Sequence, residues 1–127
     1  MYYQATITTP ANTTYAACLV TTLGLARGLI TKLLIAFPPG PVGLLHVQLK
    51  DKGWQIAPWS LGENFAWDDF VFEMNTKYEM IVEPYEVTIL TWNDDTAYEH
   101  KVFIGVEMIE GDIIKPGALS QYPLSEV

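Results

Sequence analysis

The sequence predicts an all-β protein, a single-domain β-sandwich of jelly-roll type with about eight strands. Short apolar-rich segments follow one another from about residue 28 to residue 109, and clusters of Gly, Pro, Asn and Asp separate them. Short strands at close spacing, joined by turn residues, are typical of sandwiches and jelly rolls. A chain of 127 residues suits one domain. We therefore expect an N-terminal arm at residues 1–12, a core at 13–110 and an extended tail at 111–127.

Three strands are expected before the Pro-rich turn at residues 38–41. Residues 2–9 alternate in a Thr- and Tyr-rich pattern that predicts an arm or an edge strand ending before Pro10. Residues 15–25 form a second extended segment. Residues 29–37 are apolar almost throughout and have the length of a short helix, but their β-branched side chains favour a strand.

The remaining strands follow that turn, for a total of eight or nine. Residues 43–49 alternate apolar with polar side chains, and Asp51-Lys52-Gly53 predicts a tight hairpin onto residues 54–57, because glycine supplies the positive φ that such turns need. Residues 58–64 read as a loop. The last expected strands, with Pro84 marking a corner, cover residues 65–74, 78–82, 85–92 and 100–109.

The charge and the composition of the chain argue against nucleic-acid binding, a membrane span and an internal disulfide. The formal net charge is −8, from 15 Asp and Glu against 7 Lys and Arg, which opposes binding to a phosphate backbone. The acidic surplus instead favours solubility or a basic partner surface. No stretch approaches the roughly 20 apolar residues of a membrane span, and the N-terminus lacks the basic start of a signal peptide. Cys18, the only cysteine, lies in an apolar stretch and is expected to be buried.

The sequence contains no assembled catalytic or metal-binding motif. The only histidines, His46 and His100, lie far apart, and no nucleophile motif or phosphate loop is present. Two acidic pairs at turns, Asp68-Asp69 and Asp94-Asp95, offer carboxylates to a hard cation but lack the spacing of a calcium loop. Asp at turns typically bonds its own backbone. We therefore expect no cofactor, no metal and no enzymatic activity, with a hydrolase using scattered carboxylates as the remotest alternative.

Aromatic side chains are the strongest candidates for an interaction surface. Trp54, Trp59 and Trp67 crowd into a short stretch that contains a loop with few charges. Such side chains cap an open end of the sandwich, anchor an interface or stack on sugars. We expect an oligomer interface formed by these three tryptophans together with residues of the arm and of the tail: Tyr2, Tyr3, Ile7, Ile113, Leu119 and Tyr122.

Several segments resemble the small structural proteins of tailed phages that form the capsid decoration, or cement, class. They are Phe-Pro-Pro-Gly at residues 37–40, Gly-Leu-Leu-His-Val at 43–47, Gln-Ile-Ala-Pro-Trp at 55–59, Pro-Tyr-Glu-Val at 84–87, Trp-Asn-Asp-Asp at 92–95 and Tyr-Glu-His at 98–100. The resemblance implies a homotrimer that binds the major capsid protein of a phage shell. It also implies a place on the virion surface after synthesis in the host cytoplasm, without contact to nucleic acid or membrane.

A carbohydrate-binding β-sandwich module is the alternative to a capsid protein. In that case Trp54, Trp59 and Trp67 would form a stacking platform, and Asp68, Asp69 or Asn93 would bond sugar hydroxyls.

Overall fold

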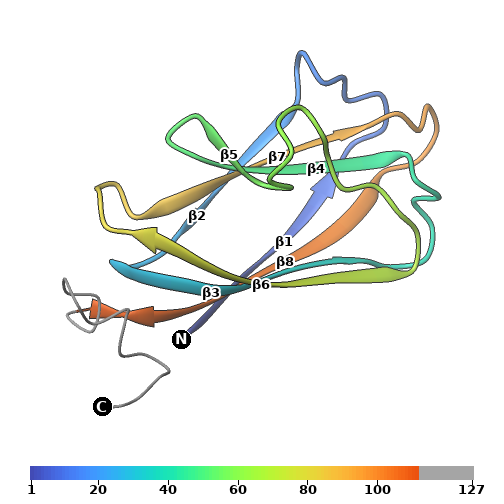
Figure 1. Ribbon diagram of the computed structural model, residues 1–127. Helices are drawn as coiled ribbons and strands as arrows, with labels where there is room; N and C mark the ends of the chain where they lie inside the picture. The colour runs from blue at the N-terminus through green and yellow to red at the C-terminus, as the bar shows by residue number, and fades with distance from the viewer. Residues whose placement is uncertain (112–127) are drawn as a thin grey trace.

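The computed structural model describes residues 1–111 as eight strands in two four-stranded antiparallel sheets, which face each other as the layers of a sandwich (Figure 1). The first sheet has the order β1-β8-β3-β6 and the second the order β2-β7-β4-β5. The strands are β1 (Tyr2–Thr9), β2 (Leu19–Gly24), β3 (Gly28–Phe37), β4 (Leu45–Asp51), β5 (Trp54–Ala57), β6 (Phe70–Met80), β7 (Glu86–Asn93) and β8 (His100–Glu110). Among these residues no helix is long and apolar enough to cross a membrane.

The strand pairing is that of a jelly roll. β1 pairs with β8, β2 with β7, β3 with β6 and β4 with β5. The first half of the chain therefore pairs antiparallel with the second half, as in one long hairpin, and the four pairs are divided between the two sheets. Each sheet contains two of these pairs, which the β3–β8 and β4–β7 ladders join. This is the double-sheet arrangement known as the jelly roll. The predicted all-β sandwich is confirmed.

The core lies between the two sheets and is made by every second residue of each strand. The inner strands contribute side chains with no exposed surface, such as Ile35 of β3, Val47 of β4 and Ile89 of β7. Each aliphatic side chain of this kind stabilises the fold by roughly 1.5–3 kcal/mol relative to an exposed position. The strand predicted for residues 100–109 is confirmed, and the even-numbered residues from 102 to 108 of β8 are buried in this core.

The structure corrects the predicted bounds of two segments. Residues 65–74 and 78–82 were expected to be separate strands, but residues 70–80 form one strand. The polar residues at 75–77 read as a break, whereas β6 is an edge strand whose outer side faces solvent, where polar side chains are favourable. In the segment 15–25 only residues 19–24 are a strand, and Cys18 in the preceding loop is half-buried rather than buried.

The first twelve residues are part of the sandwich rather than an arm. β1 pairs with β8 along its whole length, from Tyr2 opposite Glu107 to Thr9 opposite His100. The N-terminal amino group also donates to the carbonyl oxygen of Met108 at 2.8 Å. The segment is therefore an edge strand, the second of the two forms that its sequence pattern allows. The expected tail lies, beyond Gly111, outside the described residues.

The apolar segment at residues 29–37 is a strand, as its β-branched side chains predict. β3 lies inside the first sheet, between β8 and β6. Leu33, Ile35 and Phe37 face the core, while Leu34 and Ala36 between them face outward and are half-buried. The run looks helix-like in sequence because β3 is apolar on both of its faces.

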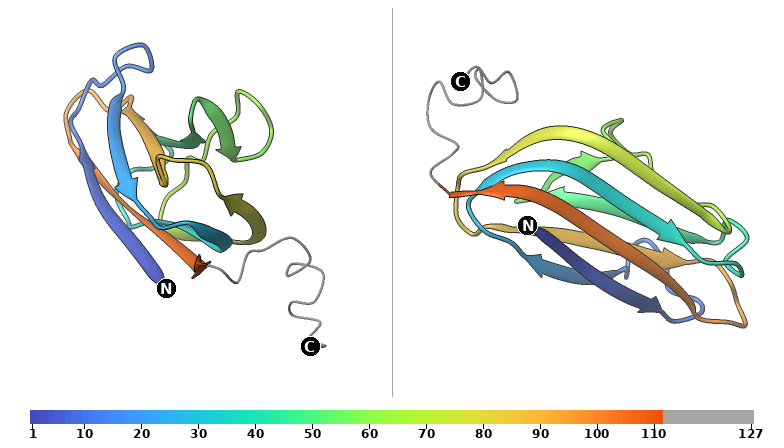
Figure 2. Two further views of the ribbon diagram at one scale, coloured as in Figure 1. Left: turned by 90° about the vertical axis from the view of Figure 1, so that its left-hand side faces the viewer. Right: turned by 90° about the horizontal axis from the view of Figure 1, so that it is seen from below.

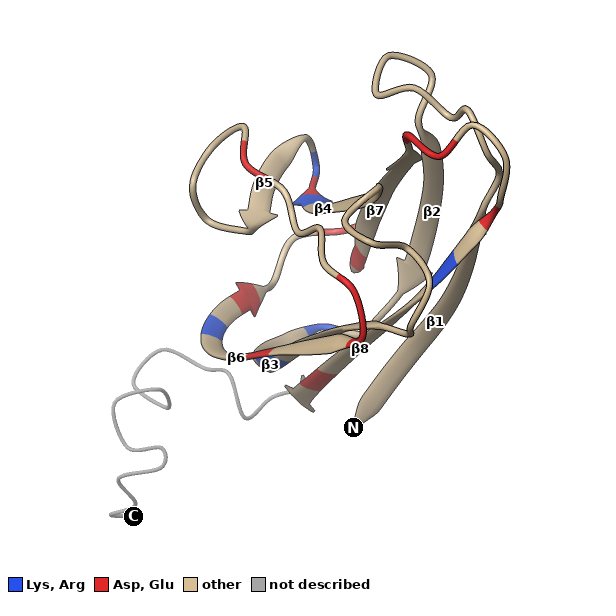
Figure 3. Ribbon diagram, turned by 90° about the vertical axis from the view of Figure 1, so that its right-hand side faces the viewer, with Lys and Arg blue, Asp and Glu red and all other residues tan. Residues whose placement is uncertain are grey.

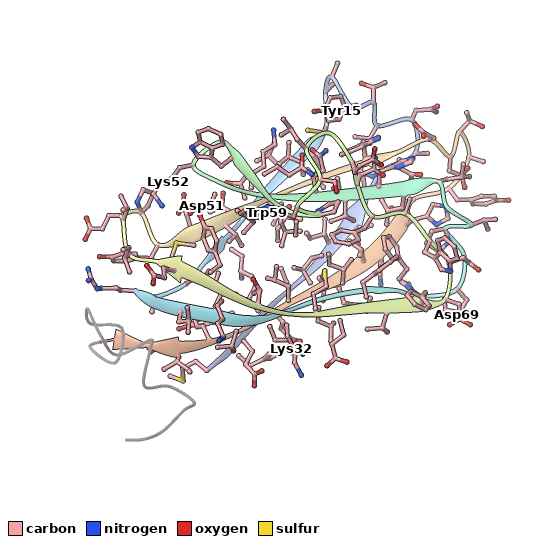
Figure 4. The ribbon with its side chains drawn as sticks, viewed as in Figure 1. Tyr15, Lys32, Asp51, Lys52, Trp59 and Asp69 are labelled. Atoms are coloured by element: carbon pink, nitrogen blue, oxygen red, sulfur yellow. The ribbon has the colours of Figure 1, made fainter. Side chains whose placement is uncertain are left out.

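Polar contacts also join the two sheets. The Thr9 hydroxyl of β1 donates to the Thr91 hydroxyl of β7 at 2.8 Å, in a fully buried position. On the opposite side the Tyr78 hydroxyl of β6 donates to the carboxylate of Asp51, which also binds Lys52 at 2.8 Å (Figure 4). Burial, followed by the hydrogen bond to Asp51, raises the pKa of Tyr78, so this phenol stays protonated and keeps donating.

Candidate functional site

Four loops meet at one end of the sandwich, which we call the loop end. These loops join β1 to β2, β3 to β4, β5 to β6 and β7 to β8, and they span residues 10–18, 38–44, 58–69 and 94–99 (Figures 1 and 2). Backbone hydrogen bonds connect them: the amide of Gly43 donates to Trp67, that of Asp94 to Leu44, and that of Asn12 to Asp95. The four loops therefore form one continuous surface.

The loop end is acidic. Its four loops contain no Lys or Arg, and their acidic residues are Glu63, Asp68, Asp69, Asp94, Asp95 and Glu99. Figure 3 shows these acidic segments from the side of the loop end, together with a basic segment where β8 begins. A surface of one sign attracts a partner of the opposite sign and repels its own copies.

Asp68 fixes the loop between β3 and β4. Its Oδ1 accepts hydrogen bonds from the backbone amides of Gly40, at 2.8 Å, and Val42, at 3.0 Å. These bonds to Val42 and Gly40 lower the pKa of Asp68 below its ordinary value, because they stabilise the charged form. The carboxylate that the sequence offered to a cation is thus engaged by the backbone of a neighbouring loop.

Asp95 has the same role in the loop between β7 and β8. Its Oδ1 accepts from the amides of Ala97 and Tyr98, and its Oδ2 lies 2.8 Å from Nε2 of His100. The hydrogen bond from Ala97, followed by that from His100, lowers the pKa of Asp95. The predicted backbone bonding of turn Asp residues is confirmed here. Within residues 1–111 no three His, Cys, Asp or Glu side chains come together as a metal site.

His46 holds two loops across the outer side of the second sheet. Its ring stacks on Trp92, with centroids 5.3 Å apart, and its two nitrogens lie 2.8 Å from Asn64 Oδ1 and Asp94 Oδ2. Tyr15, which lies above the second sheet in Figure 4, packs edge-on against the Trp92 ring, with the two ring centroids 4.7 Å apart. The β1–β2 and β5–β6 loops therefore cover this side of the second sheet.

The three tryptophans are exposed but do not form one cluster. Their exposed fractions are 77% for Trp54, 76% for Trp59 and 57% for Trp67, so they do not cap the core. Trp54 lies beside Asp51 at the far end of β4, whereas Trp67 bonds Gly43, just before β4 begins. A seven-residue strand separates these positions by roughly 20 Å. The single stacking platform expected for a carbohydrate-binding module is therefore not formed.

Trp59 stands alone on the β5–β6 loop. The side-chain amide of Gln55 organises this loop, with Nε2 within 2.7–3.0 Å of the carbonyl oxygens of Pro58, Ser60 and Glu63. Trp59 also lines a surface pocket of about 270 Å³, which Leu33 of β3 and Met74 of β6 line as well.

The three predicted interface residues of the first strand differ in their exposure to solvent. Tyr2 is 55% exposed on the outer side of the first sheet. Tyr3 is half-buried, and its hydroxyl donates to Glu110, a bond that raises the pKa of Tyr3. Ile7 is buried in the core, so the prediction that it contacts a partner is wrong: in a paired edge strand every second side chain points inward. Ile113, Leu119 and Tyr122 lie outside the described residues.

Acid is expected to weaken the loop end through Asp68. Because the pKa of Asp68 is lower in the folded chain than its ordinary value of 3.8, its stabilising contribution is complete above about pH 4 and is lost as the pH falls through the folded-state value. Urea unfolding from pH 7 to pH 2 measures this loss. Asp68→Asn keeps an oxygen acceptor that does not titrate, so the variant should lose less stability below pH 4 than the wild type. Equal losses would contradict the assignment.

Comparison with known proteins identifies similar folds. No protein-family model and no curated protein sequence matches the chain. Among solved structures, a chain of the cyanophage Pam1 capsid asymmetric unit is similar with a TM-score of 0.52 and 11% identity, over 84% of this chain and 81% of that one. The crystal structure of FLHE has a TM-score of 0.43 and 12% identity, over 84% of this chain and 94% of that one. At 11% identity the likeness to the capsid chain concerns the fold: this chain shares a β-sandwich with a phage capsid component.

Proposed function

We propose that this protein is a non-enzymatic structural component of a phage virion, a capsid decoration or cement protein that self-associates and binds the major capsid protein lattice. The observation that carries the proposal is the jelly roll of residues 1–111, which matches a cyanophage capsid chain along most of both chains. A fold does not determine a function by itself. The proposal therefore also depends on the surfaces described above.

The polar side chains at the loop end support a structural role. Several of those with the chemistry for acid–base work are engaged in fixing loops: His46 contacts Asn64 and Asp94, and Asp95 accepts from its own turn. Loops held in this way present a fixed acidic surface, which suits attachment to a basic region on the outside of a shell. The assembly implied by the resemblance is a homotrimer, which would offer three such surfaces to the lattice.

Co-sedimentation with shells tests this function. The protein is produced together with the major capsid protein encoded by the same genome, and the assembled shells are separated on a sucrose gradient. We expect the protein in the shell fraction, and its presence there should increase the resistance of the shells to heat or denaturant. A protein that stays at the top of the gradient contradicts the proposal.

Charge reversal identifies the surface that binds. Glu63 and Glu99 are exposed at the loop end, so Glu63→Lys combined with Glu99→Lys is expected to reduce the shell-bound fraction about tenfold or more. The control for the charge change of each substitution is Glu83→Lys, at an exposed position in the loop between β6 and β7 at the opposite end of the sandwich. The control should bind as the wild type does. Equal binding by all three proteins would assign attachment to another surface.

A further inference from the structure

The outer side of the first sheet carries an apolar patch, most of which lies in the half of the sheet nearer the loop end. The patch consists of Tyr2 of β1, Leu34 and Ala36 of β3, Val71 of β6 and Phe103 of β8. Val71 is 50% exposed and Phe103 is 41% exposed, and both lie directly opposite Ala36 in the strand register. We call this set the β3 patch.

Tyr2 extends the β3 patch over a glycine. Leu34 lies opposite Gly105 of β8, and a Cβ atom placed on Gly105 would overlap the Tyr2 ring. The outer part of the Tyr2 side chain therefore lies over Gly105, on the strand beside Leu34, so that the β3 patch reaches from β1 across β8 and β3 to Val71 of β6.

No described loop covers the β3 patch. The right-hand view of Figure 2 looks onto the first sheet, where β1, β8, β3 and β6 lie side by side without a described segment crossing them. The second sheet differs, because Tyr15 and Asn64 bring two loops across its outer side. A strand that is apolar on both faces is typical of a sheet buried on both sides. In this chain the outer side of β3 lacks the second layer within residues 1–111.

The charges around the β3 patch are balanced. The outward-facing charged residues of the first sheet are three lysines and three glutamates, namely Lys32, Lys77, Lys101, Glu73, Glu79 and Glu107. Lys32 and Glu73 form an ion pair at 3.0 Å beside the patch. A chain of net charge −8 repels its own copies, and the acid-only loop end does so most strongly. The first sheet is the neutral part of the surface, and this repulsion is weakest there.

The area of the first sheet is sufficient for a specific contact. Four strands about 4.8 Å apart, with about eight paired residues at about 3.4 Å each, cover roughly 500 Å². Two contacting surfaces of that size bury roughly 1,000 Å², which reaches the lower limit for a specific protein–protein interface.

We propose that the β3 patch packs against a second copy of this chain and is the main self-association interface. This inference rests on the self-association that the proposed function includes. The contact brings a second layer onto the outer side of β3 and removes Phe103, Val71 and the Tyr2 ring from water.

Light scattering after size exclusion, over a wide range of protein concentrations, tests the interface. The wild type is expected at twice or three times the chain mass of 14.3 kDa. Phe103→Lys and Val71→Lys place a charge in the contact and should weaken self-association about tenfold or more, so that both variants run at the mass of one chain. The matched control is Val20→Lys, which is 57% exposed on β2 of the other sheet and should keep the wild-type mass.

Folding of the variants is controlled separately. Phe103 and Val71 are partly exposed, so the urea midpoints of both variants should stay close to that of the wild type at a concentration where all are single chains. Thr6→Lys adds a charge at an exposed position opposite Phe103 and removes no apolar side chain. It should dissociate the oligomer as well, and a Thr6→Lys protein of wild-type mass overturns the inference.

The remaining outcomes separate this inference from the proposed function. A wild type of single-chain mass overturns the interface, and it leaves the capsid role intact if the protein still co-sediments with shells. If the wild type has single-chain mass and Phe103→Lys abolishes its shell binding, the β3 patch contacts the shell instead of a second copy. This result also overturns the proposed self-association interface. An oligomer that dissociates in Phe103→Lys but never binds shells supports the interface and overturns the capsid role.

Discussion

Gly28→Ala is expected to lower the free energy of unfolding by about 3 kcal/mol or more. Gly28 begins β3 and is paired on both sides, with Met80 of β6 and Glu110 of β8. A Cβ atom at this position would overlap the backbone carbonyl oxygen of Ile109. Backbone atoms of a strand cannot move aside as a flexible side chain can, so the β3–β8 ladder would have to separate there.

Gly24→Ala is the matched control for that substitution. Gly24 ends β2, has no positive φ, and a Cβ atom placed on it meets nothing within 4 Å. Alanine there should change the urea midpoint little or raise it slightly, because alanine reduces the freedom of the unfolded chain. Comparable losses of stability in the two variants would show that the close contact at Gly28 is not responsible.

Asn93→Ala is expected to cost about 3 kcal/mol, because Asn93 makes three side-chain hydrogen bonds worth about 1 kcal/mol each in a fully buried position. Its Nδ2 donates to the carbonyl oxygens of Thr9, at 3.2 Å, and Tyr98, at 3.0 Å. Its Oδ1 accepts from the amide of Asp95 at 3.0 Å. One side chain therefore ties the end of β1 to the β7–β8 loop.

Urea unfolding of Asn93→Ala is compared with that of Asn75→Ala. Asn75 is exposed at the middle of β6, and we expect its replacement to change stability by no more than about 0.5 kcal/mol. Shell binding by Asn93→Ala should also fall, because the loop end loses the bonds that fix its geometry. A variant at position 93 as stable as the one at position 75 would refute this role for Asn93.

The strands were predictable where a local pattern determines them. The hairpin at Asp51-Lys52-Gly53 was predicted correctly because its requirement is local: Lys52 and Gly53 both have positive φ, at 50° and 88°. β8 was predicted correctly because every second residue from Val102 to Met108 is apolar and buried. The break predicted at residues 75–77 was wrong because polarity in an edge strand reports exposure to solvent rather than a turn.

The candidate surfaces were less predictable because they depend on partners far away in the sequence. The pattern of residues 2–9 indicated a strand, but only the pairing with β8 shows that Ile7 faces the core and Tyr2 faces outward. Trp54 and Trp67 are close in sequence and lie at opposite ends of β4. The structural role of Asn93 was also missed, because an Asn before two Asp residues predicts a turn and not a buried hydrogen-bonding centre.

The pairing of the first strand with the last has a consequence for how this chain folds during synthesis. Tyr2 lies opposite Glu107, so the first sheet cannot close until almost all of the described residues have left the ribosome. The hairpin of β4 and β5 closes the shortest loop and therefore costs the least chain entropy, whereas the β1–β8 ladder costs the most. Domains in which most contacts join residues far apart in the sequence fold in milliseconds to seconds. During that interval the side of β1 that later pairs with β8 is free to pair with another nascent chain, so correct assembly and misassembly compete at the first strand.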